Sequence, residues 1–330
     1  MRRVLNAHSE VNVADETHYF DDLRQRVGGT APLSTGQKAE VVSYFSALRL
    51  REYMFGAGLK SRDRADETAA FEELQNIQTA DEAFAEYCRL AAAGQGKRVW
   101  GEKTPRHLFQ IEEILSAFPT SRIIIMMRDP RAVIASHRDW RQGWLNAHAE
   151  VTGLDAEVAR EAQRMQRSYN LTIVALIWRA AAATALRLTE GATDPRVRLV
   201  RFEELVTRPG KTLQSVLDWL ELPFEPALLH TIVSKSSYAA DENRKGFNAD
   251  AIERWKARLS EPEAAYVDAI CGTVVARLGY PASGARLKPW FTLQELLKLP
   301  FSLLLAARAN RHRIGNLKRF VLIRARSLRS

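Results

Sequence analysis

The sequence has few cysteines, and their placement excludes two kinds of site. Cys88 and Cys271 are its only two among 330 residues, and they lack the close spacing of metal-ligating cysteines. This usage suits a reducing compartment and argues against a disulfide framework or a cysteine-based zinc site. We therefore predict a cytoplasmic protein with no metal cofactor.

The sequence also lacks a long uninterrupted apolar run. The best candidate, Leu299 to Ala307, covers less than half of the roughly 20 residues that a membrane-spanning helix needs. The arginines at the start are not followed by the apolar stretch of a signal peptide. We expect neither a membrane span nor a secretory leader. A complete Gly-x-x-x-x-Gly-Lys-Ser/Thr loop is absent too, because the tripeptide Gly210-Lys211-Thr212 has Leu205 where that pattern needs its first glycine. This disfavours a P-loop nucleotide kinase.

Acidic residues are scarce in one region only. Residues 281–330 hold 11 of the 48 Lys and Arg residues, but Glu295 is their single acid out of 39 in the chain. The rest of the chain is therefore close to neutral, although the net charge is +9. We expect no nucleic-acid partner for the body, and any electrostatic partner belongs to the C-terminal segment.

One strand-to-helix corner stands out among the residues that are present. Five consecutive apolar residues, 123–127, indicate a strand buried on both faces. Asp129 suits a helix N-cap and Pro130 the first helical position, so Arg128 lies between the strand and the helix. In open α/β folds this carboxyl edge binds ligands, and a helix N-terminus favours anions. From spacing alone, an ordinary turn with a solvated arginine explains the corner equally well.

The remaining pattern alternates short strands with helices. Strands are predicted at 98–101 and 197–201 besides 123–127, which favours an α/β fold with a parallel sheet and right-handed crossovers. Residues 1–8 read as helix, and residues 9–13 as a change of direction. The other predicted segments are mostly helical stretches at 28–96, 107–118, 155–188, 210–221 and 250–278, with a polar loop at 137–148.

Two further stretches carry concentrated polar chemistry. Residues 15–20 are dense in ionisable and aromatic groups, which suits either a site or a helix start with Asp15 as N-cap. Lys103 follows the predicted strand 98–101 at a second strand-to-helix turn. A lysine in such a turn is ordinarily a solvated charge, so it becomes notable only if neighbouring turns present cations at the same place.

Together these stretches resemble the sulfotransferases that use 3′-phosphoadenosine 5′-phosphosulfate (PAPS). Arg128 to Arg131, with Ser136 eight residues after Arg128, is similar to the segment that binds the 3′-phosphate of PAPS. Arg244-Lys245-Gly246 resembles the segment that closes over that phosphate. Residues 102–105 resemble a lysine-containing turn of carbohydrate sulfotransferases, and residues 15–20 resemble a segment whose glutamate is the acceptor base.

The resemblance covers residues 1–280, where residues 118–123, 200–205, Trp255 and 278–280 also fit. It implies a helix-rich α/β fold, a P-loop-like parallel sheet flanked by helices, with 281–330 as a basic amphipathic extension. The family's opening strand and its Pro-Arg-Ser-Gly-Thr-Thr loop, which cradles the 5′-phosphosulfate, have no counterpart here. We therefore expect the sheet to lack its first central strand and the chain to be weakly active or inactive. A start codon assigned too late, a truncated chain and a degenerate binding protein are the alternatives.

The resemblance also implies roles for individual residues. Glu16 is the expected general base, Lys103 stabilises charge on the transferred sulfonate, and His18 orients Glu16 or touches substrate. The residues expected to hold the 3′-phosphate are Arg128, Ser136, Arg244, Lys245 and Gly246. Cytosolic members have a catalytic histidine where this chain has Pro105, so their mechanism does not transfer, and His107 is off register.

The implied reaction moves a sulfuryl group from PAPS to an acceptor hydroxyl of a carbohydrate or lipid-linked glycan. The alternative is a non-catalytic protein that binds adenosine 3′,5′-bisphosphate (PAP), or a membrane-associated scaffold. Residues 285–330 combine apolar and basic side chains. That pattern fits a helix lying on an anionic membrane, here the inner membrane face, and it also fits a helix packed on the body with a solvated basic end.

Overall fold

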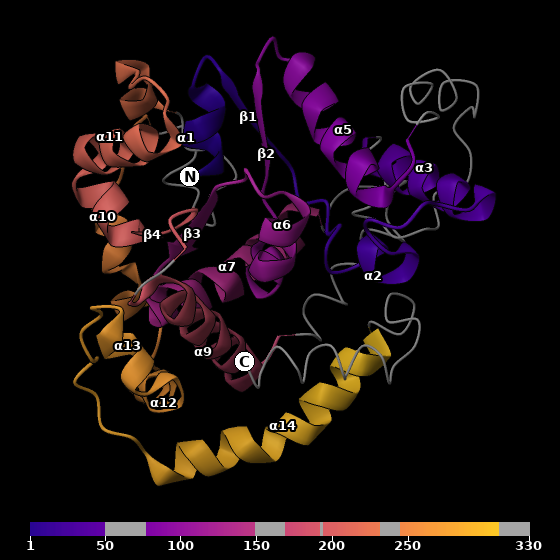
Figure 1. Cartoon of the computed structure of the whole chain (residues 1–330). Coiled ribbons are helices and arrows are strands. Elements are labelled where there is room, and N and C mark those ends of the chain that lie inside the picture. Colours follow the sequence, from indigo (N-terminus) through magenta and orange to yellow (C-terminus); the bar gives the residue numbers. More distant parts are fainter. Residues whose placement is uncertain (50–76, 149–168, 192–193, 232–244, 310–330) are drawn as a thin grey trace. The chain divides into compact units, whose positions relative to one another are not determined.

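Four strands, paired two by two, organise the part of the chain that the structure describes (Figure 1). The structure is a computed structural model, and its described residues are 1–49, 77–148, 169–191, 194–231 and 245–309. The chain divides into unit 1, Met1–Ile123 with Glu225–Thr231, and unit 2, Ile124–Phe224 with Ile232–Ser330. The predicted boundary between a domain of residues 1–280 and an extension of residues 281–330 stays a prediction.

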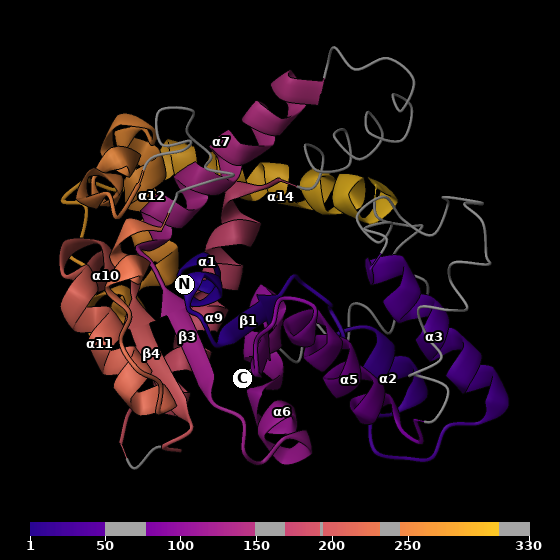
Figure 2. The same cartoon turned by 90° about the horizontal axis from the view of Figure 1, so that it is seen from above.

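Unit 1 contains a parallel strand pair. Strands β1 (Val11–Ala14) and β2 (Val99–Glu102) run in register from Val11 opposite Val99 to Ala14 opposite Glu102. Its described helices are α1 (Arg2–Ala7), α2 (Leu23–Val27), α3 (Thr35–Arg49), α5 (Ala80–Ala93) and α6 (Ile111–Ala117), with 3₁₀ turns η3 (Pro105–Gln110) and η4 (Pro226–His230). Parallel neighbours need a long crossover, and the chain through α2, α3 and α5 supplies it. Helix α5 packs on both strands (Figure 2).

An aromatic cluster fixes the segment that follows β1. Tyr19 and Phe20 are buried, and the Tyr19 ring stacks on Phe84 with centroids 4.7 Å apart. Phe20 meets the same ring edge-on at 5.7 Å, and the Tyr19 hydroxyl donates to Asp81 at 2.6 Å. Buried aromatics contribute large apolar areas, so these two side chains anchor the ionisable residues that precede them.

Unit 2 is built around an apolar helix. Strand β3 (Ile123–Met127) starts at the unit boundary and pairs with β4 (Val197–Arg201). The described helices are α7 (Pro130–His148), α9 (Leu171–Thr189), α10 (Phe202–Thr207), α11 (Pro209–Leu220), α12 (Glu261–Cys271), α13 (Thr273–Arg277) and α14 (Pro289–Ala309), with 3₁₀ turns η6 (Ala249–Ile252) and η7 (Arg254–Ala257). Helix α9 contacts β4 and the helices α7, α12, α13 and α14.

The length of α9 contradicts one expectation from the sequence. Its 19 residues are long and apolar enough to cross a membrane, judged by length and composition alone. The expectation that no stretch reaches this length was therefore wrong. Within unit 2, however, Ala175, Trp178 and Ala182 on α9 are buried against neighbouring elements. Packing in a protein core is thus sufficient to explain its composition.

The structure confirms the three predicted strands and corrects several other segments. Strand β3 is fully buried on one face only, at Ile125 and Met127, and not on both faces as expected. Residues 11–14 form β1, where only a change of direction was expected. Asp15 caps no helix, because the next helix begins at Leu23. Residues 137–148 are not a loop but continue α7, since a helix nucleated at Pro130 extends by one hydrogen bond per residue. Residues 105–110 and much of 249–257 are 3₁₀ turns rather than α-helix.

Candidate active site

Residues from the ends of β1 and β2 form an ion pair at one edge of the unit 1 sheet. Because the strands are parallel and Ala14 lies opposite Glu102, the segments that follow them leave the sheet at the same edge. Glu16 follows β1 and Lys103 follows β2, and Lys103 Nζ donates a hydrogen bond to Glu16 Oε1. Their side chains are 40% and 42% exposed. A carboxylate and an ammonium group are thus held together within reach of solvent.

His18 adds an imidazole to this pair. Its Nε2 lies 3.6 Å from Glu16 Oε2, and its Nδ1 lies 3.4 Å from Asp21 Oδ1. The backbone of His18 has φ 53°, a left-handed conformation that is uncommon outside glycine. Its backbone N–H donates to Thr104 Oγ1 at 3.2 Å, which helps to hold this conformation. The structure therefore brings together the three residues predicted to be catalytic, Glu16, His18 and Lys103.

The residue before Lys103, Glu102, is a buried carboxylate that contacts the segments carrying Glu16, His18 and Lys103. Its Oε1 accepts hydrogen bonds from the Thr17 backbone N–H at 2.7 Å, the Thr17 hydroxyl at 2.9 Å and the Thr104 hydroxyl at 2.5 Å. Its Oε2 lies 3.0 Å from His107 Nδ1. Burial acts to raise the pKa of Glu102, but the His107 and Thr104 hydrogen bonds outweigh it and lower the pKa. Glu102 is therefore an ionised brace between the segments after β1 and β2.

The His107 side chain is buried, and both of its ring nitrogens contact neighbouring protein groups. Its Nε2 accepts a hydrogen bond from the Phe20 backbone N–H at 3.3 Å, so its proton is on Nδ1, which faces Glu102. The side chain is 9% exposed. Both ring nitrogens thus serve the framework that supports the Glu16 group.

Asp21 is a second buried carboxylate, with a side chain only 2% exposed. Arg106 lies 2.8 Å from its Oδ2. Burial acts to raise the pKa of Asp21, but the His18 hydrogen bond and the Arg106 charge hold it below its usual value. Asp21 is a fixed negative charge that orients the His18 ring.

Sequence reasoning missed this supporting layer of Glu102, Asp21 and Arg106. The available signals were weak: Glu102 directly precedes Lys103, and Asp21 lies three residues after His18. No local pattern distinguishes a buried, paired carboxylate from a solvated one. Only the packing around these residues identifies them.

The corner after β3 has the predicted local structure. Asp129 Oδ1 accepts a hydrogen bond from the Arg131 backbone N–H at 2.8 Å, as an N-cap does. Arg128 is partly buried: a guanidinium nitrogen donates to the Ala251 carbonyl at 2.8 Å, and the guanidinium carbon lies 4.2 Å from the centre of the Phe202 ring. The side chain is thereby held in a defined position at the carboxyl end of the strand.

Arg131 differs from Arg128 in its surroundings. Its side chain is 1% exposed, and its guanidinium donates to Asp129 Oδ2 at 2.6 Å and to the Pro281 carbonyl at 2.6 Å. The Trp255 ring lies below it, with the guanidinium carbon 4.4 Å from the ring centre. Arg131 therefore links the start of α7 to the C-terminal part of unit 2 and is a structural cation.

The other predicted phosphate-binding residues are placed unevenly. Ser136 lies in α7, partly buried, on the helix that begins after Arg128. Lys245 is exposed, and Gly246 has φ 80°, a backbone conformation that favours glycine. Arg244 lies outside the described residues. Arg128 and Ser136 thus share one strand-to-helix unit, and the binding roles of all these residues stay predictions.

Comparisons with known proteins identify the family of the chain. The family model described as "Sulfotransferase family" matches residues 1–226. Nodulation protein NoeE of Sinorhizobium fredii is 26% identical over 215 residues, covering 62% of this chain and 49% of NoeE. Protein-tyrosine sulfotransferase 1 of Danio rerio is 23% identical over 291 residues, covering 85% of this chain and 68% of that protein. Carbohydrate sulfotransferase 1 of Mus musculus is 26% identical over 176 residues, covering 48% and 38%.

The extent of the matches differs between the comparisons. The chain spans about half the length of NoeE, which is 49% covered. Among solved structures, the sulfotransferase domain from the curacin biosynthetic pathway resembles the chain with a TM-score of 0.48 and 18% identity. That similarity covers 85% of this chain and 92% of the curacin domain.

Proposed function

The chain belongs to the sulfotransferase family, and from this premise we propose that it transfers a sulfuryl group from PAPS to an acceptor hydroxyl. The observation that carries the proposal is the Glu16 carboxylate, which lies between Lys103 and His18 at the carboxyl edge of the unit 1 sheet. A carboxylate that can take up a proton, next to a cation that can stabilise developing negative charge, meets two needs of this reaction.

The proposed step is a direct displacement at sulfur. Glu16 takes the proton of the acceptor hydroxyl as the hydroxyl oxygen forms a bond to sulfur. The bond from sulfur to the 5′-phosphate oxygen breaks, and PAP leaves with the electron pair. Lys103 stabilises the charge on the sulfonate and on the leaving phosphate, as cations do in phosphoryl transfer. His18, held by Asp21, orients Glu16.

The proposed donor site uses the corner after β3. Arg128 and Ser136 bind the 3′-phosphate, because an arginine fork matches paired phosphate oxygens and a hydroxyl adds one donor. Arg244, Lys245 and Gly246 complete this clamp. The support is the position of Arg128 at a strand end, held by Phe202 and the Ala251 carbonyl.

We propose a carbohydrate or lipid-linked glycan as the acceptor. The lysine-containing turn at 102–105 resembles that of carbohydrate sulfotransferases, and a carbohydrate sulfotransferase is among the relatives. Protein-tyrosine sulfotransferases are among them too, so a tyrosine hydroxyl is the competing acceptor. A panel of glycans, lipid-linked glycans and tyrosine-containing peptides separates these classes.

The test measures donor binding and transfer separately. Calorimetry with PAP reports binding by the 330-residue chain, and radiolabelled PAPS reports transfer to the acceptor panel. We expect Glu16→Gln to lower turnover by about 10²–10⁴-fold with PAP affinity unchanged, the usual effect of losing a general base. Arg128→Ala should instead weaken PAP binding by about 10–100-fold, through loss of charged hydrogen bonds.

A matched control is Glu112→Gln, which alters an exposed carboxylate on α6 and should leave both readouts unchanged. Equal turnover in Glu16→Gln and the parent would refute the base assignment. PAP binding without transfer to any acceptor would favour either the non-catalytic binding protein or the weak activity that the missing Pro-Arg-Ser-Gly-Thr-Thr loop predicts. Transfer to tyrosine peptides alone would overturn the glycan assignment.

A further inference from the structure

Helix α14 packs on unit 2 through an unusually polar side. Glu295 is 7% exposed, and Ser302 Oγ accepts a hydrogen bond from Asn170 Nδ2 at 3.1 Å. An apolar contact is made by Phe291, whose ring lies 5.8 Å from that of Tyr266 on α12. These contacts define which side of α14 faces the protein.

The opposite side of α14 is apolar and open to solvent. Positions 290, 293, 297, 301 and 304 fall on one stripe, because residues three, four and seven apart share a helix face. The exposed fractions are 61% for Trp290, 59% for Leu293, 71% for Leu297, 64% for Phe301 and 64% for Leu304. The helix therefore has its polar contacts on the protein side and its apolar stripe outside, the reverse of an ordinary surface helix.

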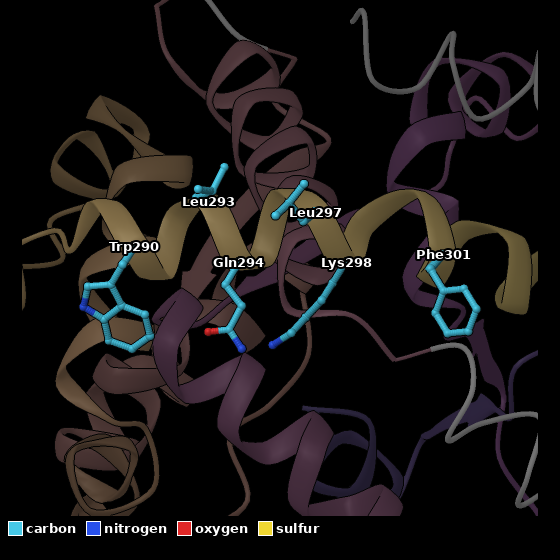
Figure 3. A pocket seen from close by; sticks show the side chains of 6 residues that line it. All are labelled: Trp290, Leu293, Gln294, Leu297, Lys298 and Phe301. Atoms are coloured by element: carbon cyan, nitrogen blue, oxygen red, sulfur yellow. The ribbon is translucent and has the colours of Figure 1, made fainter.

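This stripe lines a shallow hollow along the helix (Figure 3). Among the residues that the structure describes, those that line the hollow all belong to α14: Trp290, Leu293, Gln294, Leu297, Lys298 and Phe301. The side chains of Gln294 and Lys298 lie between those of Trp290 and Phe301 along the helix (Figure 3). The surface is thus one extended helix face, which suits an extended apolar phase better than an enclosed small molecule.

The charges around the stripe indicate what kind of surface binds to it. Residues 281–330 contain 11 Lys or Arg residues, and their single acid, Glu295, is turned toward the protein. Arg286, Lys288, Lys298 and Arg308 are exposed next to or within α14. Two copies of this segment would repel one another, whereas an anionic bilayer attracts each basic residue near its surface.

From these observations we propose that α14 binds an anionic lipid surface. The side chains of Trp290, Leu293, Leu297, Phe301 and Leu304 enter the boundary between headgroups and acyl chains, and the neighbouring cations contact the headgroups. The proposal goes beyond sulfuryl transfer and does not depend on it. It is compatible with both interpretations of this segment, since α14 packs on unit 2 and still leaves an apolar face exposed.

The test is flotation of the full chain with vesicles of phosphatidylcholine alone or with 30% phosphatidylglycerol. The parent should bind the anionic vesicles, and high salt should weaken binding. The double variant Leu297→Gln with Phe301→Gln should lower the partition coefficient by at least about tenfold, because it removes two of the large apolar side chains that would leave water on binding. Circular dichroism checks that the variant is folded.

The matched control is Ile177→Gln, which removes an apolar side chain that is 51% exposed on α9 of the same unit. It should bind vesicles like the parent. Absence of parent binding to anionic vesicles, or equal binding by the double variant, would overturn the proposal. So would concentration-dependent dimerisation that the double variant abolishes while vesicle binding is absent, because the stripe would then be a contact between two copies.

Discussion

Two strand-to-helix corners of this protein use their charged residues in opposite ways. After β2, Lys103 and its partner Glu16 are 42% and 40% exposed. After β3, Arg131 and its partner Asp129 are 1% and 8% exposed. The first corner thus presents an ion pair to solvent in unit 1, and the second buries an ion pair in unit 2. The residues of a motif therefore have to be sorted by burial before chemical roles are assigned to them.

The physical basis of this difference is desolvation. A buried ion pair needs further hydrogen bonds to its two partners, and at the second corner the Pro281 carbonyl accepts one from Arg131 and Asp129 accepts one from the Arg131 backbone N–H. An exposed pair gains little stability, so its components are available for other interactions. This contrast predicts that changes at the two corners separate stability from activity.

The largest expected effect is the loss of stability caused by a change at the buried corner after β3. Arg131→Met leaves Asp129 and Asp268 without their cation and should lower the free energy of unfolding by about 3–5 kcal/mol, as measured by urea denaturation. Arg89→Met is the control, because Arg89 is 54% exposed and pairs with Glu86 on the surface of α5. That change should cost less than about 1 kcal/mol. Equal losses in the two variants would contradict the contrast.

A change at the exposed corner after β2 should instead affect activity. Lys103→Met should reduce sulfuryl transfer by about 10²–10³-fold through loss of transition-state charge stabilisation. The free energy of unfolding should change by less than about 1 kcal/mol, since the Lys103 pair with Glu16 is half exposed. Lys211→Met, an exposed lysine on α11, is the matched control for transfer. A large loss of stability in Lys103→Met would show that this pair is a brace after all.

A smaller effect on stability is expected at Glu102, the buried carboxylate that supports the Glu16–Lys103 pair. The pKa of Glu102 is lowered in the folded state from its usual 4.5. Its contribution is therefore complete above about pH 4.5 and disappears as pH falls through the folded-state pKa. Glu102→Gln should lower the free energy of unfolding by about 1–3 kcal/mol at pH 7.

The difference between Glu102→Gln and the parent should shrink as the pH of the urea denaturation is lowered from 7 to 3. Glu112→Gln, at an exposed carboxylate of the same unit, should match the parent throughout. A difference that does not vary with pH would mean that Glu102 acts through its shape and not through its charge.

The corner after β3 was predictable because its signals are local. An apolar run, an N-cap and a proline at the first helical position occupy eight consecutive residues, and the structure confirms the strand, the cap and the helix. By contrast β1 was missed. It has four residues, and its strand conformation depends on pairing with residues 99–102. Pairing across such a separation leaves no local pattern in either segment.

At the site around Glu16, too, some residues could be identified from the sequence and others only from the structure. The sequence identified Glu16, His18 and Lys103 as candidates, but not that Glu102, Asp21 and Arg106 support them. Two of these supporting residues are carboxylates with ordinary neighbours in sequence, and they become distinctive only when burial removes water from them. The catalytic roles themselves stay predictions.

The sequence by itself determined the family resemblance, the strand-to-helix corners and the concentration of basic and apolar residues after position 281, because each depends on neighbouring residues. Only the tertiary structure decided that Arg131 is buried while Lys103 is exposed, and that α14 directs Glu295 inward and its apolar stripe outward. Burial is set by contacts between segments distant in sequence, and it determines whether a charge is a brace or a reactive group, and whether an apolar face is a core or a binding surface.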